Sequence, residues 1–109
     1  MARKIVLRGE VPDDMHAIVA YLEQHSLAAA DRFAEAVFAA LDGLAEMPGK
    51  GSLKQFRSRK LEGVRSWAVP GFRKYLILYR TLSEAIEVLA VTHGSRRLRK
   101  LLLHRAESS

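Results

Sequence analysis

The amino-acid sequence predicts an α+β fold with the element order β-αα-βββ-α, in which an N-terminal helical hairpin packs on a mostly antiparallel sheet. Two observations carry this prediction. Apolar residues recur with a helical period between residues 11 and 44, which is typical of helices with one buried face. From residue 64 onward, short β-branched and aromatic runs alternate with turn residues, which indicates strands joined by hairpins. We expect one domain spanning residues 1–109.

A strand and a helix are predicted at the start of the chain. The β-branched stretch RKIVLR at residues 3–8 has the composition of a strand. Pro12, Asp13 and Asp14 follow it, and proline and acidic residues favour the first turn of a helix, where backbone N–H groups lack partners. The helix is expected to end near His25. Its apolar stripe comprises Val11, Met15, Ile18, Val19 and Leu22.

A second helix is predicted directly after the first. Ser26 is a candidate N-cap, because its hydroxyl oxygen can accept a hydrogen bond from a first-turn N–H group. The sequence MPGKG at residues 47–51 stops this helix, and the short break before it implies an antiparallel hairpin. Residues 49–59 show no period, so we expect an exposed and mobile connection there. The apolar stripe comprises Ala30, Phe33, Val37, Ala40, Leu41 and Leu44.

The second half of the chain is predicted to form most of the sheet. Strands are expected at residues 64–69, 73–80 and 85–93, with turns at Pro70-Gly71 and Ser83-Glu84. Apolar residues on both faces of 75–79 and 86–91 predict central strands that are covered on both sides. Residues 96–105 are expected to form a short basic helix carrying Leu98, Leu101 and Leu102.

Charge is divided unevenly along the chain. Residues 1–49 contain 4 Lys and Arg against 8 Asp and Glu, a net charge of −4, whereas residues 50–109 contain 14 against 4, a net charge of +10. This asymmetry predicts a basic surface suited to a polyanionic or acidic partner, and the alternative is a basic face that serves solubility alone. The absence of cysteine, of a leader-like N-terminus and of any long apolar run predicts a cytoplasmic protein that does not contact membranes.

The titratable residues form no recognisable catalytic or metal-binding motif. His93 lies at the predicted end of a strand, where functional side chains often emerge, but a lone histidine there is more often structural. His16, His25 and His104 lie apart and lack the spacing of metal ligands. No glycine-rich phosphate loop is visible, so we expect neither a metal nor a cofactor.

Four stretches together resemble the RelE/ParE family of type II toxin–antitoxin toxins, over nearly the whole chain from residue 3 to residue 103. These stretches are AIVAYL in the first helix, AAADRFAEAVFAALDGLAEMPGKG through the second, LEGVRSWAVPGFRKYLILYR and IEVLAVTHGSRR. The fold that this resemblance implies has the β-αα-βββ-α order that the periodicity predicts independently.

The resemblance implies one of two activities. RelE-like members cleave mRNA in the ribosome and typically carry an arginine directly after the first tyrosine of the strand that follows the hairpin turn. Here Leu76 follows Tyr75, and leucine cannot stabilise a pentavalent phosphate. Trp67 and Ala68 occupy the preceding strand, where that branch places charged side chains. ParE-like members inhibit DNA gyrase and commonly show the pattern YLI.YR found at residues 75–80. For a nuclease, the remaining working set would be Arg65, Arg73, Arg80 and His93.

We therefore expect a ParE-like toxin without catalytic residues that binds DNA gyrase and forms a hetero-oligomer with a cognate antitoxin. Arg97 stands where family members often have aspartate, which makes this loop more basic. The alternatives are a RelE-like endonuclease acting on the ribosome and mRNA, and a non-toxic basic domain that binds nucleic acid. The expected partner-binding residues are Arg73, Lys74, His93, Arg96, Arg97 and Arg99.

Overall fold

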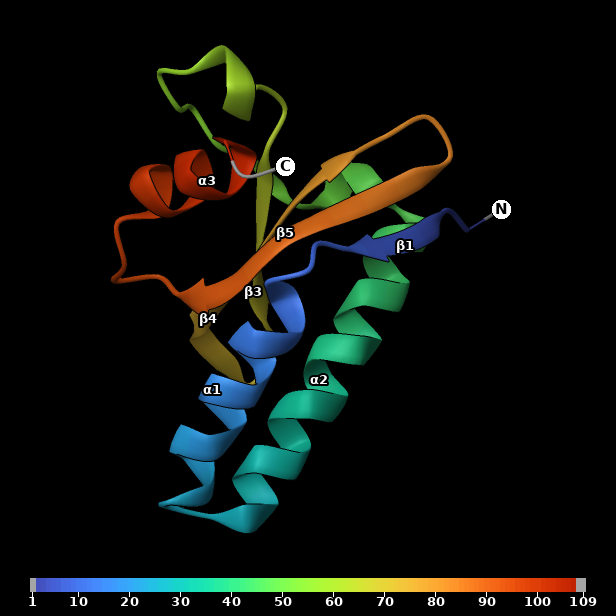
Figure 1. Ribbon diagram of the computed structural model, residues 1–109. Coiled ribbons are helices and arrows are strands. Elements are labelled where there is room, and N and C mark those ends of the chain that lie inside the picture. Colours follow the sequence, from blue (N-terminus) through green and yellow to red (C-terminus); the bar gives the residue numbers. More distant parts are fainter. Residues whose placement is uncertain (1, 108–109) are drawn as a thin grey trace.

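The computed structural model describes residues 2–107 and places a five-stranded sheet between helices that cover both of its faces (Figure 1). The helices and strands are β1 (Lys4–Leu7), α1 (Val11–Glu23), α2 (Leu27–Glu46), β2 (Ser52–Leu53), β3 (Arg65–Val69), β4 (Phe72–Thr81), β5 (Ala85–His93) and α3 (Leu98–Glu107). The strand order is β1-β5-β4-β3-β2, and only the β1–β5 pair is parallel among the described strands. The predicted α+β architecture is confirmed, with the short strand β2 added to it.

The hairpin of α1 and α2 covers one face of the sheet (Figure 1). Ser26 caps α2 as predicted, because its Oγ accepts a hydrogen bond from the Ala29 backbone N–H at 3.1 Å. Phe33 packs edge-on against Phe72 and Tyr75 of β4, with ring centroids 5.3 and 5.2 Å apart. Every residue of the predicted α2 stripe is buried, which confirms the prediction of the face that this helix turns to the core.

The other face of the sheet is covered by α3 and by the segment that precedes β3. Leu102 of α3 is buried against Leu78 and Leu89 of the two central strands, and Leu61 belongs to the same apolar cluster. The prediction that the strands at 75–79 and 86–91 are covered on both sides is therefore confirmed. Helix α3 begins at Leu98, two residues later than the predicted start at Arg96.

The connection between α2 and β3 has structure of its own. Two 3₁₀ helices, Pro48–Lys50 and Arg59–Leu61, flank β2. The Tyr79 hydroxyl donates a hydrogen bond to the Pro48 carbonyl at 2.6 Å and accepts one from the Gly51 N–H at 3.0 Å, and burial raises the pKa of this phenol. A side chain at Gly51 would overlap the Tyr79 hydroxyl. Most residues of this connection are exposed, as predicted. The expectation of a connection without structure is wrong, because the segment forms two 3₁₀ helices and a strand and is hydrogen-bonded to Tyr79, 28 and 31 residues away.

None of the helices in the described part of the chain combines the length and apolar character that a membrane crossing requires.

Candidate partner-binding surface

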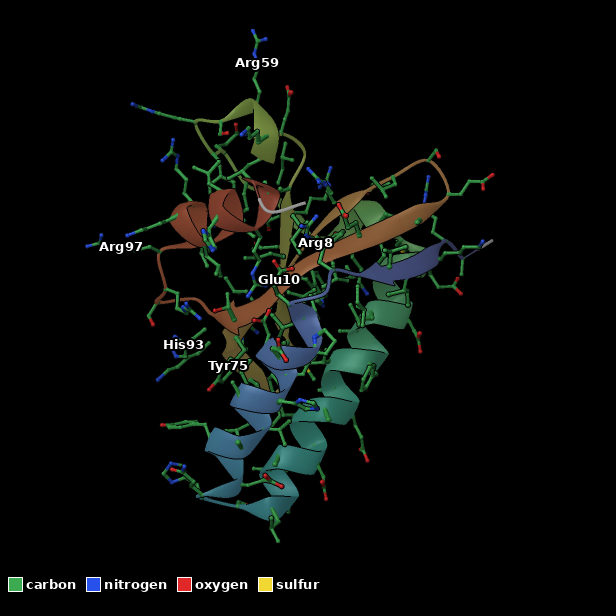
Figure 2. All side chains as sticks on the ribbon, in the orientation of Figure 1. Arg8, Glu10, Arg59, Tyr75, His93 and Arg97 are labelled. Atoms are coloured by element: carbon green, nitrogen blue, oxygen red, sulfur yellow. The ribbon has the colours of Figure 1, made fainter. Side chains whose placement is uncertain are left out.

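The residues predicted to bind partners lie near the ends of three elements. Arg73, Lys74 and His93 lie where β4 begins and β5 ends, Arg96 and Arg97 follow in the loop, and Arg99 lies in the first turn of α3. Tyr75 is paired with His93 across these two strands, and the Gly94 N–H donates a hydrogen bond to the Lys74 carbonyl at 2.7 Å. Figure 2 shows Tyr75 and His93 side by side at this end of β5, with Arg97 pointing away from the ribbon. Five of the six side chains are exposed, and His93 is half-buried. We call Arg73, Lys74, His93, Arg96, Arg97 and Arg99 the sheet-end surface.

His93 is held by its backbone and aromatic neighbours, not by an acidic partner. Its Nδ1 accepts a hydrogen bond from the Ser95 N–H at 3.1 Å, so the proton of the neutral imidazole resides on Nε2. Tyr75 meets the ring edge-on at a centroid distance of 5.2 Å. No carboxylate among the described residues contacts the imidazole, so His93 lacks the orienting group that a general base usually has.

A cavity of about 310 Å³ opens between α1 and the end of β5. Asp13 and Tyr21 line it from α1, and Tyr75, His93 and Arg96 line it from the sheet end. The pKa of Tyr75 is raised, first by burial and then by the neighbouring Tyr21, so its phenol stays neutral and is a poor base. The cavity therefore offers hydrogen-bond donors and a guanidinium to a partner's polar group. The residues that line this cavity from α1, and Tyr75, were not among the predicted site residues.

The set of residues expected for a nuclease is divided between the two ends of the strands, with Arg73 and His93 at one end and Arg65 and Arg80 at the other. Arg73 and Arg80 lie at opposite ends of β4, about 23 Å apart along an extended strand of this length. The Arg80 side chain pairs with Glu87 at 2.8 Å. Arg65 lies opposite Tyr79, and its Nη1 donates hydrogen bonds to the carbonyls of Gly51 (2.7 Å) and Gly49 (3.2 Å). Both Arg65 and Arg80 thus hold the fold together at the end of the strands that is remote from His93.

A largely buried ion pair fastens α3, which carries Arg99 of the sheet-end surface, to α1. The Arg105 guanidinium donates to both carboxylate oxygens of Asp14, at 2.7 and 2.6 Å, and also to the Leu89 carbonyl at 2.8 Å. Asp14 in turn accepts a hydrogen bond from the Val91 N–H at 3.0 Å. The bond from Asp14 raises the pKa of Arg105 further.

These contacts provide hydrogen-bond partners for backbone groups at the edge of β5, beyond the point where β1 ends. Strand β1 is paired with β5 only as far as Val88, and the Arg8 N–H donates to the Val88 carbonyl at 3.0 Å. Past that point, the side chains of Asp14 and Arg105 bind the N–H of Val91 and the carbonyl of Leu89. Two side chains therefore continue the hydrogen bonding that a longer β1 would provide.

In residues 2–107, no three side chains of His, Cys, Asp or Glu come together in a way that could hold a metal ion. The arrangement at the sheet end is a set of exposed cations beside a cavity with both apolar and polar lining residues. The expectation that this surface binds partners stays a prediction.

Comparison with known proteins finds a family model and a solved structure that are similar to this chain. The model described as "ParE toxin of type II toxin-antitoxin system, parDE" matches residues 5–98. Among solved structures, the chain is similar to one described as "Chromosomal ParDE TA system from P. aeruginosa", with a TM-score of 0.67 and 14% sequence identity over 84% of this chain and 96% of that chain. At this identity the similarity shows the fold. A search of curated proteins found no match.

Proposed function

Because the chain belongs to the ParE toxin family of type II toxin–antitoxin systems, we propose that it arrests growth by binding DNA gyrase and that a cognate antitoxin neutralises it in a hetero-oligomer. The observation that carries the proposal is the division of the cations between the two ends of the strands. Those of the sheet-end surface are exposed and free to contact a partner, whereas Arg65 and Arg80 are engaged in contacts within the fold.

Chemistry supports binding over cleavage. Cleavage of an RNA phosphodiester needs a base for the 2′-hydroxyl and cations around the developing phosphorane, all within a few ångströms of one phosphate. Among the residues that the structure describes, His93 has no acidic partner, and Leu76 occupies the position next to Tyr75. A surface of separate exposed arginines instead suits recognition of another protein, where charge steers association and fixes the orientation of the partners.

Inhibition of purified gyrase tests this function. We expect the protein to inhibit supercoiling of relaxed plasmid DNA by gyrase, and the antitoxin to restore it when added in equimolar amount. Induction in cells should then stop DNA replication and produce filaments while bulk mRNA stays intact. Uninhibited gyrase, together with mRNA cuts in phase with codons soon after induction, would instead assign the RelE-like endonuclease activity.

An apolar groove between α1 and α2 supports the antitoxin part of the proposal. It encloses about 340 Å³ and is lined by Leu7, Met15 and Phe38, among other apolar side chains. Phe38 is 57% exposed, and the adjoining edge strand β1 exposes Ile5 and Val6 as well as Leu7. Such a groove suits the apolar face of an amphipathic partner helix.

Phe38→Glu is expected to weaken antitoxin binding at least about tenfold, because an aromatic side chain at the centre of an interface contributes strongly and a buried charge opposes docking. Titration of labelled antitoxin with purified toxin measures the effect. Leu27→Glu is the matched control, since Leu27 is 69% exposed on the same helix but does not line the groove. Equal affinities for the two variants would place the antitoxin elsewhere.

A further inference from the structure

A cationic surface that shares Arg97 and Arg99 with the sheet-end surface is formed where α3 meets the segment before β3. The two segments are remote in sequence, but the Arg99 Nη2 donates a hydrogen bond to the Arg57 carbonyl at 3.4 Å, and Leu61 and Leu102 share one buried cluster. Figure 2 shows Arg59 and Arg97 projecting away from these two segments. Six exposed cations make up this surface, which we call the α3–loop surface: Arg57, Arg59, Lys60, Arg97, Arg99 and Lys100.

Unlike Arg8, Arg80 and Arg105, the cations of the α3–loop surface have no acidic partner among the described residues. Arg8, Arg80 and Arg105 form ion pairs with carboxylates. None of the six exposed cations forms one within the described part of the chain. Residues 54–61 and 94–106 contain no acidic residue at all. Like charges on one surface repel one another, and the first turn of α3 is where the helix dipole disfavours cations.

We propose that the α3–loop surface binds the phosphate backbone of a nucleic-acid duplex without reading its bases. A polyanion relieves the repulsion among all six cations at once, because Lys and Arg side chains displace the counterions condensed on the phosphates. Contacts of this kind position a protein on a duplex and carry no sequence information. The α3–loop surface differs from the sheet-end surface in Arg57, Arg59, Lys60 and Lys100, and the inference does not depend on gyrase being the target.

The positions of the exposed apolar side chains, which lie outside the α3–loop surface, favour a nucleic acid over an acidic protein as the ligand. Protein interfaces usually have an apolar centre surrounded by polar residues. The large exposed apolar side chains among the described residues include Leu7 and Phe38 of the α1–α2 groove, and none lies in segments 54–61 and 94–106. A surface of cations without an apolar centre suits phosphates, which need charge and hydrogen-bond donors but no burial of apolar area.

Fluorescence anisotropy of a labelled duplex DNA of arbitrary sequence, titrated with the full chain at several salt concentrations, tests this proposal. We expect log Kd to change linearly with log salt concentration, with a slope of about 0.9 per phosphate contacted. The double variant Arg59→Ala, Lys60→Ala should reduce that slope by about 1.8 and weaken binding about tenfold or more at low salt. Neither residue belongs to the sheet-end surface, so gyrase inhibition should persist.

Lys4→Ala, Arg32→Ala is the matched control, because it removes the same charge from two exposed positions outside the α3–loop surface. It should leave Kd within about twofold. A duplex RNA and a labelled poly-glutamate peptide are titrated in parallel. Binding to both duplexes supports recognition of the phosphate backbone. Binding to only one of them shows whether DNA or RNA supplies the phosphates. Absence of duplex binding at low salt, equal losses in the two double variants, or tighter binding of the peptide than of either duplex would overturn the proposal.

Discussion

Asp14→Asn is expected to lower the free energy of unfolding by about 3–5 kcal/mol, because it leaves the Arg105 guanidinium buried without its counter-charge. The two side chains are only 11% and 9% exposed, so water cannot replace the lost partner. The asparagine carbonyl can still accept the hydrogen bonds from the Val91 N–H and from Arg105 Nη1. The asparagine NH2 group then faces Arg105 Nη2, so the variant removes the charge and one hydrogen bond together. A loss of this size is a large part of the stability of a small domain.

Urea unfolding followed by circular dichroism measures the effect of Asp14→Asn. Asp13→Asn is the matched control, because Asp13 is the neighbouring acidic residue of the same helical turn, is exposed, and forms no ion pair among the described residues. Its unfolding free energy should change by no more than about 0.5 kcal/mol. Similar midpoints for the two variants would show that Asp14 and Arg105 do not fasten α3 to the sheet.

The triple variant Arg96→Ala, Arg97→Ala, Arg99→Ala is expected to weaken gyrase inhibition by up to about 100-fold, because exposed ionic contacts contribute about 1.5- to 5-fold each in affinity. His93→Ala should change inhibition by no more than about fivefold, as expected for one contact among several. A catalytic group would behave differently, since its removal typically costs about 100-fold or more in rate.

The supercoiling assay with purified gyrase, repeated over a range of toxin concentrations, measures both variants. Helix α3 should stay docked in the triple variant, because Leu102 and the Arg105–Asp14 pair are unchanged. Circular dichroism and antitoxin binding verify this, and Lys4→Ala, Arg32→Ala shows the effect of charge removal elsewhere. Growth arrest after induction in cells is compared as well. Full loss of toxicity from His93→Ala in a folded protein, with the triple variant still toxic, would favour the endonuclease.

The sequence determined the helical hairpin and the central strands, because both depend on patterns with short periods. Each of the confirmed features follows from residues that are close in the sequence. These features are the apolar stripe of α2, the cap at Ser26 and the cover on both faces of β4 and β5. The gathering of Arg73 and Lys74 with His93 and the loop after it follows in the same way, since a hairpin brings the start of one strand to the end of the next.

Tertiary structure alone decided which cations are free and which are engaged. A bulge between Leu78 and Tyr79 shifts the register of β4 and β5, and this places Tyr75 opposite His93 instead of Thr92. Asp14 has the sequence context of an ordinary first-turn acid, yet its partner Arg105 is 91 residues away. The contacts of Arg65 with Gly49 and Gly51 likewise join segments that no local period connects. Long-range ion pairs and side-chain hydrogen bonds depend on how separate elements meet in space, and for this reason the sequence predicted the total charge of the basic half but not its division into structural and exposed cations.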